Sequence, residues 1–110
     1  MTGTWEALTD PTRRAIVERL ARRELTAGEV AALFDVSRPG ISRHLRVLRE
    51  AGVVEAEARG QQRIYRVVPE ALDEVEQWCR DVRSFWAQRL DALDTEIARG
   101  RRARGKDSDD

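Results

Sequence analysis

The side chains best suited to recognise another molecule are four arginines within residues 37–52. At 3.6 residues per turn, Ile41, Leu45 and Leu48 form one apolar stripe, and the arginines fall largely on the other side. Guanidinium groups donate to phosphate oxygens and to the guanine edge, and a helix fits the major groove of duplex DNA. This segment therefore predicts a DNA recognition helix. Its polar residues are Arg38, Ser42, Arg43, Arg46 and Arg49.

Two kinds of DNA contact are predicted along this helix. Arg38 and Ser42 lie near its N-terminus, the end that usually points at base edges, and Gly40 would allow a close approach of the backbone. For Gly40, a glycine without any functional role is an equally good explanation. For the arginines, the alternative is a helix face that is simply exposed to solvent and contacts no DNA. Contacts further along reach phosphates, which position the protein without specifying sequence. The predicted contacts are Ser37, Arg38, Pro39, Gly40, Ser42, Arg43, His44 and Arg46, with Arg43, His44 and Arg46 assigned to phosphates.

A second basic segment follows the recognition helix. Residues 53–58 and 62–68 read as two strands joined by a short turn. A basic hairpin fits beside a duplex, where it reaches phosphates or the minor groove. Arg59, Gln61 and Arg63 are its predicted DNA contacts, and a mobile polar turn is the alternative reading.

Metal and catalytic chemistry have little support in the sequence. His44 is the one histidine, and no second histidine or paired cysteine accompanies it as a metal ligand. We expect it to bond a phosphate or the turn backbone. A single histidine without a nucleophile gives no catalytic triad. The one cysteine, Cys79, lies on an apolar helical stripe, which favours buried packing over redox sensing.

Helix signals precede and follow the recognition segment. Asp10 followed by proline predicts a helix start, and Thr26 with Glu29 has the form of a capping box. Residues 35–37 are too few for anything except a tight turn, and Gly52 ends the recognition helix. A short helix, a turn, a basic helix and a hairpin form the order of a winged helix-turn-helix. The predicted fold class is mainly α with a small β-hairpin.

Residues 69–98 form a long helical pattern without an internal proline or glycine. Thirty helical residues span roughly 45 Å, which is longer than a small domain requires. One small domain cannot cover the large side chains of its stripe, so a partner subunit is the expected cover. The stripe contains Leu72, Val75, Cys79, Val82, Trp86, Leu90, Leu93 and Ile97, flanked by Trp78 and Phe85.

Charge is distributed unevenly along the 110 residues, although the formal net charge is zero. Residues 37–66 carry seven basic and three acidic side chains, net +4, whereas residues 67–98 carry three and eight, net −5. This distribution would direct one face toward a polyanion and another away from it. We expect one domain over residues 1–98 and a disordered charged tail over residues 99–110. The absence of a long apolar run or a signal-peptide pattern, together with the single cysteine, predicts a cytoplasmic protein without a membrane span.

Three segments together resemble the ArsR-type (ArsR/SmtB) winged helix-turn-helix repressors of bacteria. They are ALTDPTR at residues 7–13, Ser37 with SRHLRVLREAGVV at residues 42–54, and Gly60 with YRV at residues 65–67. The resemblance covers roughly residues 5–98. It implies a homodimeric transcriptional regulator that binds double-stranded DNA, with Arg38, Ser42, Arg43 and His44 at DNA-facing positions. It also implies a dimer interface made by the first and last helices. The resulting interface prediction is Trp5, Leu8, Leu72, Val75, Cys79, Val82, Trp86, Leu90 and Leu93.

The chain departs from the metal sensors of that family. Residues 24–30 lack the cysteine pair that such sensors carry at the start of the third helix, and the last helix has no histidine. Asp35 occupies the turn position that often holds glycine, and aspartate tolerates a left-handed conformation. The resemblance therefore implies a branch that senses no metal and needs no cofactor. The effector is not legible in the sequence.

The expected function is a sequence-specific DNA-binding regulator, a repressor that acts as a homodimer on an inverted repeat. The residues alone leave two alternatives to this function open. The winged helix could be a protein-interaction module whose long helix docks a partner, or Cys79 could make the protein a thiol-based redox sensor.

Overall fold

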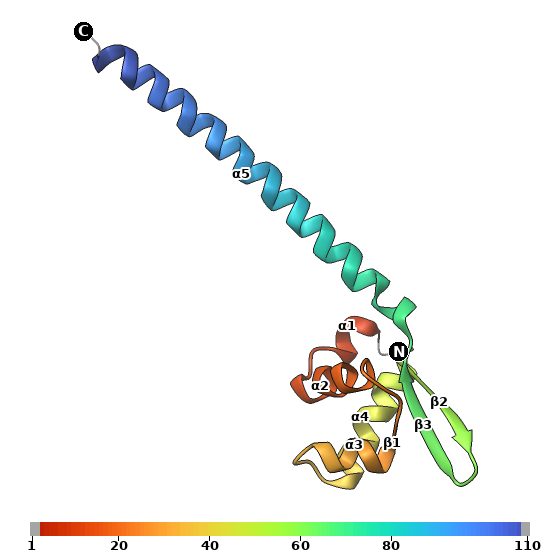
Figure 1. The fold of residues 1–110 in the computed structure, drawn as a ribbon. Helices are drawn as coiled ribbons and strands as arrows, with labels where there is room; N and C mark the ends of the chain where they lie inside the picture. The colour runs from red at the N-terminus through yellow and green to blue at the C-terminus, as the bar shows by residue number, and fades with distance from the viewer. Residues whose placement is uncertain (1–2, 109–110) are drawn as a thin grey trace. The chain divides into compact units, whose positions relative to one another are not determined.

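The computed structural model describes the backbone of residues 3–108 and the side chains up to Gly100. The chain divides into an N-terminal unit, Met1–Glu74, and a C-terminal unit, Val75–Asp110, and each is described by itself. The N-terminal unit holds short helices and a small sheet, which confirms the predicted fold class (Figure 1). Its elements are α1 (Thr4–Ala7), α2 (Pro11–Leu20), β1 (Leu25–Thr26), α3 (Ala27–Leu33), α4 (Arg38–Glu50), β2 (Val54–Arg59), β3 (Gln62–Val67) and the 3-10 helix η1 (Pro69–Leu72).

Side chains cap the helices where the sequence predicts them. The Asp10 carboxylate accepts a hydrogen bond from the Arg13 backbone N–H at 3.0 Å, with proline at the start of α2. Thr26 and Glu29 make both halves of a capping box at the start of α3. Each cap satisfies donors that a helix N-terminus leaves without an internal partner. The sequence therefore fixes where α2 and α3 begin.

The turn between α3 and α4 is extended rather than left-handed. Phe34, which ends α3, has φ −128° and ψ 148°. No described residue other than glycine has a positive φ. Asp35 occupies a turn position that often holds glycine, but it does not adopt the left-handed conformation expected there. An extended Phe34 redirects the chain without it.

The recognition segment ends at Gly52 as predicted, with φ +80°. The Gly52 N–H donates to the Arg49 carbonyl and the Val53 N–H donates to the Leu48 carbonyl, both at 3.0 Å. This pair of bonds is a Schellman motif, which uses the last carbonyls of the helix and requires a left-handed residue. Gly52 thereby turns the chain directly from α4 into β2.

The sheet has the strand order β1-β3-β2, with both pairings antiparallel. Arg59 pairs with Gln62 across a two-residue turn, and Gly60 there has φ +61°. The hairpin matches the sequence prediction to within a residue at each end. The two-residue β1 was not predicted, because two residues are too short to show a strand's alternation. Leu25 in β1 pairs with Tyr65 in β3, so β1 ties the hairpin to the helices.

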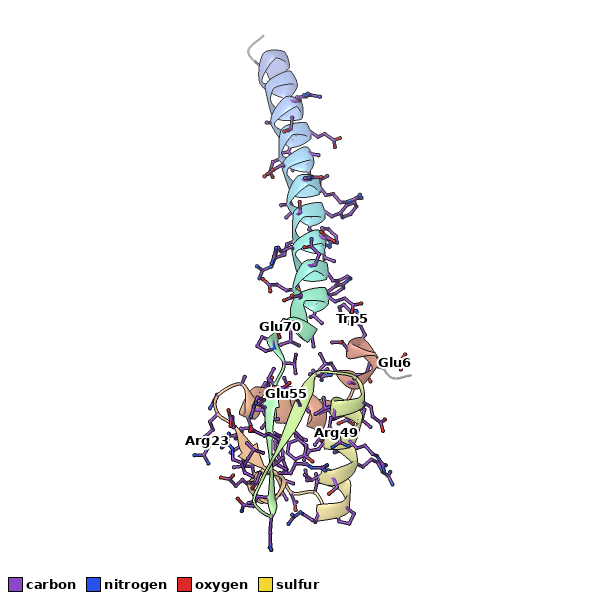
Figure 2. All side chains as sticks on the ribbon, turned by 90° about the vertical axis from the view of Figure 1, so that its right-hand side faces the viewer. Trp5, Glu6, Arg23, Arg49, Glu55 and Glu70 are labelled. Atoms are coloured by element: carbon purple, nitrogen blue, oxygen red, sulfur yellow. The ribbon has the colours of Figure 1, made fainter. Side chains whose placement is uncertain are left out.

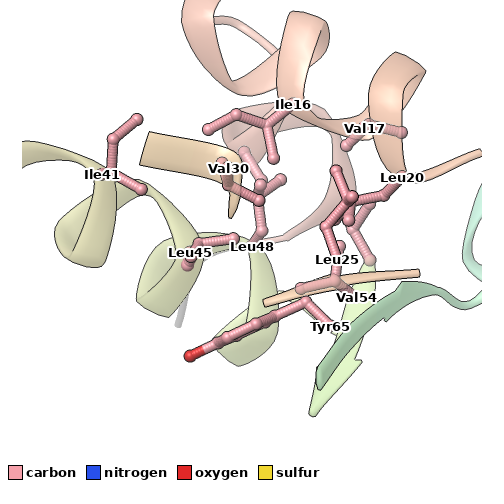
Figure 3. Close-up of a cluster of buried hydrophobic side chains, with 12 residues drawn as sticks. Ile16, Val17, Leu20, Leu25, Val30, Ile41, Leu45, Leu48, Val54 and Tyr65 are labelled. Atoms are coloured by element: carbon pink, nitrogen blue, oxygen red, sulfur yellow. The ribbon is translucent and has the colours of Figure 1, made fainter. Parts of the chain in front are cut away.

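One apolar core joins α4 to α2, α3 and the sheet (Figure 3). From α4 it takes the predicted stripe, Ile41, Leu45 and Leu48, each at most 1% exposed. These side chains pack with Ile16, Val30 and others, as the close-up shows. Because one face of α4 is buried in the core, the opposite face of that helix is exposed to solvent.

The C-terminal unit consists of the continuation of α5 (Asp73–Ser108). The sequence predicted a helix end at Ala98, and the structure continues the helix to Ser108. Residues 109–110 of the predicted tail lie outside the described residues. Among the described residues, no helix is long and apolar enough to cross a membrane.

The apolar stripe of α5 repeats with a period of eleven residues. Its members follow one another at intervals of four, three and four residues, and then the pattern starts again. Eleven residues in three turns is 3.67 per turn, close to the 3.6 of a straight α-helix. The stripe therefore runs almost parallel to the helix axis. It consists of Val75, Cys79, Val82, Trp86, Leu90, Leu93 and Ile97.

Candidate nucleic-acid interface

The packing of the apolar stripe of α4 determines which side chains of this helix face solvent. The buried stripe leaves Arg38, Ser42, Arg43 and Arg46 exposed on the same helix. Arg49, one turn further, is also exposed, and Figure 2 labels it on this helix. None of these arginines makes an ion pair with another residue in the part of the chain that the structure describes. The helix thus presents guanidinium groups whose charge is not neutralised internally.

The start of α4 explains Gly40 without DNA. The Ser37 hydroxyl oxygen accepts a hydrogen bond from the Gly40 backbone N–H at 3.2 Å. A Cβ atom on residue 40 would lie 2.8 Å from the Val36 Cγ1 and 3.2 Å from the Ser37 Oγ. The first distance is shorter than van der Waals contact allows. The packing against Val36 and Ser37 therefore favours glycine at position 40 within the protein itself, and the close approach to DNA stays a prediction.

His44 lies against α2 instead of on the outer face. Its side chain is 18% exposed, and its Nδ1 lies 3.9 Å from the Asp10 Oδ2 and 3.4 Å from the Arg13 Nη1. The sequence expected this imidazole to reach a phosphate or the turn backbone. Its position four residues from Gly40 places it at the edge of the buried stripe, where α2 covers it. His44 thus links the recognition helix to the capped start of α2.

Two arginines that sequence reasoning missed hold α1 against α2. Arg13 Nε donates to the Ala7 carbonyl at 2.6 Å, and Arg14 Nη1 donates to the Leu8 carbonyl at 2.8 Å. A helix as short as α1 leaves most of its carbonyls without internal partners, so these bonds satisfy them. The signal was present in the sequence as a basic pair shortly after Asp10. Arg13 also reaches His44, which connects α1 to the recognition helix.

The hairpin neutralises some of its arginines internally. Arg59 Nη2 lies 3.3 Å from a Glu24 carboxylate oxygen and 3.4 Å from one of Glu57. Arg66 also pairs with Glu57, and its guanidinium lowers the pKa of that carboxyl. Arg59, predicted to contact DNA, is therefore held by two carboxylates. Arg63 is exposed and makes no ion pair with a described residue, and Gln61 at the turn is exposed too.

The predicted interface residues fall into two groups. Leu8 and Leu72 are half-buried against the core of the N-terminal unit, so they already have partners within one chain. Trp5 is 39% exposed, and its indole N–H donates to a Glu74 carboxylate oxygen at 2.7 Å. On α5, Trp86, Leu90 and Leu93 are about half exposed. The α5 stripe is therefore the uncovered part of the predicted interface.

Cys79 is exposed in the single chain. The sequence analysis placed it in the dimer interface, and its burial there stays a prediction. Within the described residues, no group of three or more histidine, cysteine or acidic side chains could hold a metal ion.

A model of the helix-turn-helix domain matches residues 8–57 of this chain. The HTH-type transcriptional regulator Rv2034 of Mycobacterium tuberculosis is 44% identical over 86 residues, which is 78% of each protein. The transcriptional repressor SdpR of Bacillus subtilis is 36% identical over 78 residues, covering 71% of this chain and 87% of SdpR.

Solved structures show the same likeness. The crystal structure of an ArsR family transcriptional regulator has a TM-score of 0.67 and 33% identity over 74% of this chain and 84% of its own. The homodimeric winged helix-turn-helix DNA-binding domain of Mb0332 from Mycobacterium bovis has a TM-score of 0.60 and 25% identity, covering 73% and 74%.

Proposed function

The chain belongs to the ArsR family of winged helix-turn-helix transcriptional regulators, and we propose that it represses transcription in the cytoplasm by binding an inverted-repeat operator as a homodimer. The observation that carries the DNA-binding part is the outer face of α4. The buried stripe turns that face toward solvent, and its arginines make no ion pair with any residue whose side chain the structure describes. Such a helix suits the major groove.

We assign base contacts to Ser42 and Arg43, and phosphate contacts to Arg46. Arg43 lies opposite Ile41 and Leu45, and Ser42 is exposed beside it, both in the first half of α4, the half that usually points at base edges. This keeps the sequence assignment of Ser42 and Arg46 and changes two others, because the sequence analysis gave Arg38 to bases and Arg43 to phosphates. The reason is that the Arg38 guanidinium lies beside α3, close to Gly28.

The homodimer is supported by the exposed stripe on α5 and by the homodimeric state of the Mb0332 domain. Large apolar side chains in a continuous row are costly to leave in water, and a second copy offers a matching row. Two recognition helices related by a twofold axis would enter successive major grooves about 34–36 Å apart. The operator should then be an imperfect inverted repeat.

Repression is supported by the likeness to SdpR, which is itself a transcriptional repressor. A dimer seated on a promoter blocks access of other proteins to the same DNA. We place the protein outside the metal-sensing branch of the family because residues 24–30 lack a cysteine pair and the last helix has no histidine.

Replacing Arg43 by alanine tests the assignment of the groove face. If Arg43 makes a bidentate contact to guanine, Arg43→Ala should cost about 1–3 kcal/mol on the operator and much less on random duplex. Fluorescence anisotropy on both duplexes at several salt concentrations measures the two affinities. Arg22→Ala removes the same charge from an exposed arginine near the end of α2 and serves as the control. Equal losses on both duplexes for Arg43→Ala would mean that this residue reads no base.

A further inference from the structure

A polar hollow of about 290 Å³ lies between the start of α3, the first residue of α4 and the tip of the hairpin. Arg38 comes from α4, Arg63, Gln61 and Gln62 come from the hairpin, and Thr26 with two small residues closes the third side. The seven lining residues include two guanidinium groups and two amides but no carboxylate. All of them belong to the N-terminal unit. The hollow therefore collects hydrogen-bond donors and positive charge.

The charges around this hollow differ from those elsewhere on the hairpin. Arg59 and Arg66 are tied to Glu24 and Glu57, whereas Arg38 and Arg63 make no ion pair with any described residue. Arg38 and Arg63 come from separate elements and keep their charge free of internal ion pairs with described residues. Together they can bind an anionic ligand. A single phosphate group is small enough for the hollow and matches the donors in it.

Gly28 lies beside the Arg38 side chain at this place. A Cβ atom on residue 28 would lie 3.8 and 3.9 Å from the two terminal nitrogens of Arg38. The guanidinium thus lies over the backbone of α3, beside the hollow, although Arg38 begins the recognition helix. This location makes a phosphate contact an alternative to the base contact that the sequence predicts for Arg38.

We propose that this hollow binds one phosphodiester of the DNA backbone, held jointly by Arg38 of the recognition helix and Arg63 of the hairpin. The proposal rests on the proposed DNA-binding function and specifies one subsite of it. A shared phosphate locks the hairpin and the recognition helix onto the same strand. It makes Arg38 a residue that fixes the register of the helix in the groove without reading a base.

The test measures binding of wild type, Arg38→Ala, Arg63→Ala and the double variant to the operator and to random duplex over a range of salt. Both residues are exposed, and circular dichroism checks that each variant folds. Because the two groups share one ligand, the double variant should lose less affinity than the product of the single losses. The salt slope of the double variant should fall by about 0.9 per subunit, the value for one phosphate. Operator and random duplex should be affected alike.

The pair Arg22→Ala and Arg63→Ala is the matched control and should be additive, because Arg22 lies outside the hollow. A methylphosphonate at the contacted backbone position should abolish the effect of the double variant.

The outcomes separate the two proposals. If the wild type binds no duplex, the proposed function fails. If the wild type binds but Arg38 and Arg63 behave additively, with a slope change of two phosphates, the shared subsite is refuted alone. Selective loss on the operator for Arg38→Ala also overturns it.

Discussion

At the scale of single residues, Gly40 shows how a helix start can depend on one missing methyl group. Gly40→Ala should lower the free energy of unfolding by about 1–3 kcal/mol, because its Cβ would overlap Val36. Gly28→Ala is the control, since its Cβ would meet only ordinary contacts at 3.8 Å. We expect that variant to be neutral or more stable by up to about 1 kcal/mol. Urea unfolding at fixed protein concentration measures both. A Gly40→Ala protein as stable as wild type contradicts the packing argument.

Asp10 makes stability depend on pH in the acid range. The Arg13 backbone N–H that bonds its carboxylate holds the pKa of Asp10 below its ordinary value, with His44 and the Arg13 charge adding to the effect. Because the pKa of Asp10 is lower in the folded state, its ionised carboxylate contributes fully to folding stability at pH values above its unfolded-state pKa of about 3.9. This contribution to stability is lost as the pH falls through the folded-state pKa.

Asp10→Ala should therefore cost about 1 kcal/mol at pH 7. Asp10→Asn keeps a capping oxygen and should cost less. The stability difference between wild type and Asp10→Asn should shrink as the pH is lowered from 5 to 3, which urea unfolding at each pH measures. Asp35→Asn changes an exposed carboxylate in the turn and should show no comparable trend. A wild-type advantage that persists unchanged at pH 3 would be inconsistent with this cap.

The roles of the capping residues could be predicted from the sequence. The positions of some side chains on α4 could not, and the reason is the same for each. Asp10, Thr26 and Gly52 act through their immediate neighbours, so local patterns identify them. His44 and Arg38 are positioned by α2 and α3, which the sequence of α4 does not contain. Local sequence therefore indicates which residues cap a helix, whereas tertiary packing decides which of its charges face outward.

At the scale of elements, the hairpin carries its own acidic groups. Glu57 holds Arg59 and Arg66, so Arg59 is not wholly available to a phosphate. Glu57→Gln should raise the affinity for duplex DNA and steepen the salt slope by up to about 0.9 per subunit, because Arg59 then keeps only Glu24 as a carboxylate partner and becomes more available to a phosphate. Anisotropy titrations in increasing salt measure both quantities. Glu18→Gln, the same charge change on the exposed side of α2, should leave the slope unchanged. An unaltered slope for Glu57→Gln would show that Arg59 stays away from DNA.

The sequence predicts the hairpin well because the glycine turn and the alternation on both sides are local signals. It does not predict β1, since Leu25 and Thr26 become a strand only by pairing with β3. It also places the end of α5 too early, because a change from apolar to charged residues does not itself end a helix.

At the scale of the whole molecule, we propose that the dimer depends on the stripe of α5. Leu90→Glu puts an unpaired charge where a second copy should pack, which costs about 3 kcal/mol or more. The dimer dissociation constant should rise about a hundredfold or more, and operator affinity should fall with it. Sedimentation velocity over a range of concentrations measures the association. Ser84→Glu adds the same side chain on the opposite side of the helix and should stay dimeric. If Leu90→Glu also stays dimeric, the stripe does not form the interface.

Selection of bound fragments from a randomised duplex library tests most directly whether this is a dimeric, sequence-specific DNA-binding protein. We predict enrichment of an imperfect inverted repeat whose half-site centres lie about 10–10.5 base pairs apart, or a multiple of that spacing. Recovery of no preferred sequence, even in dilute buffer, would contradict the central claim.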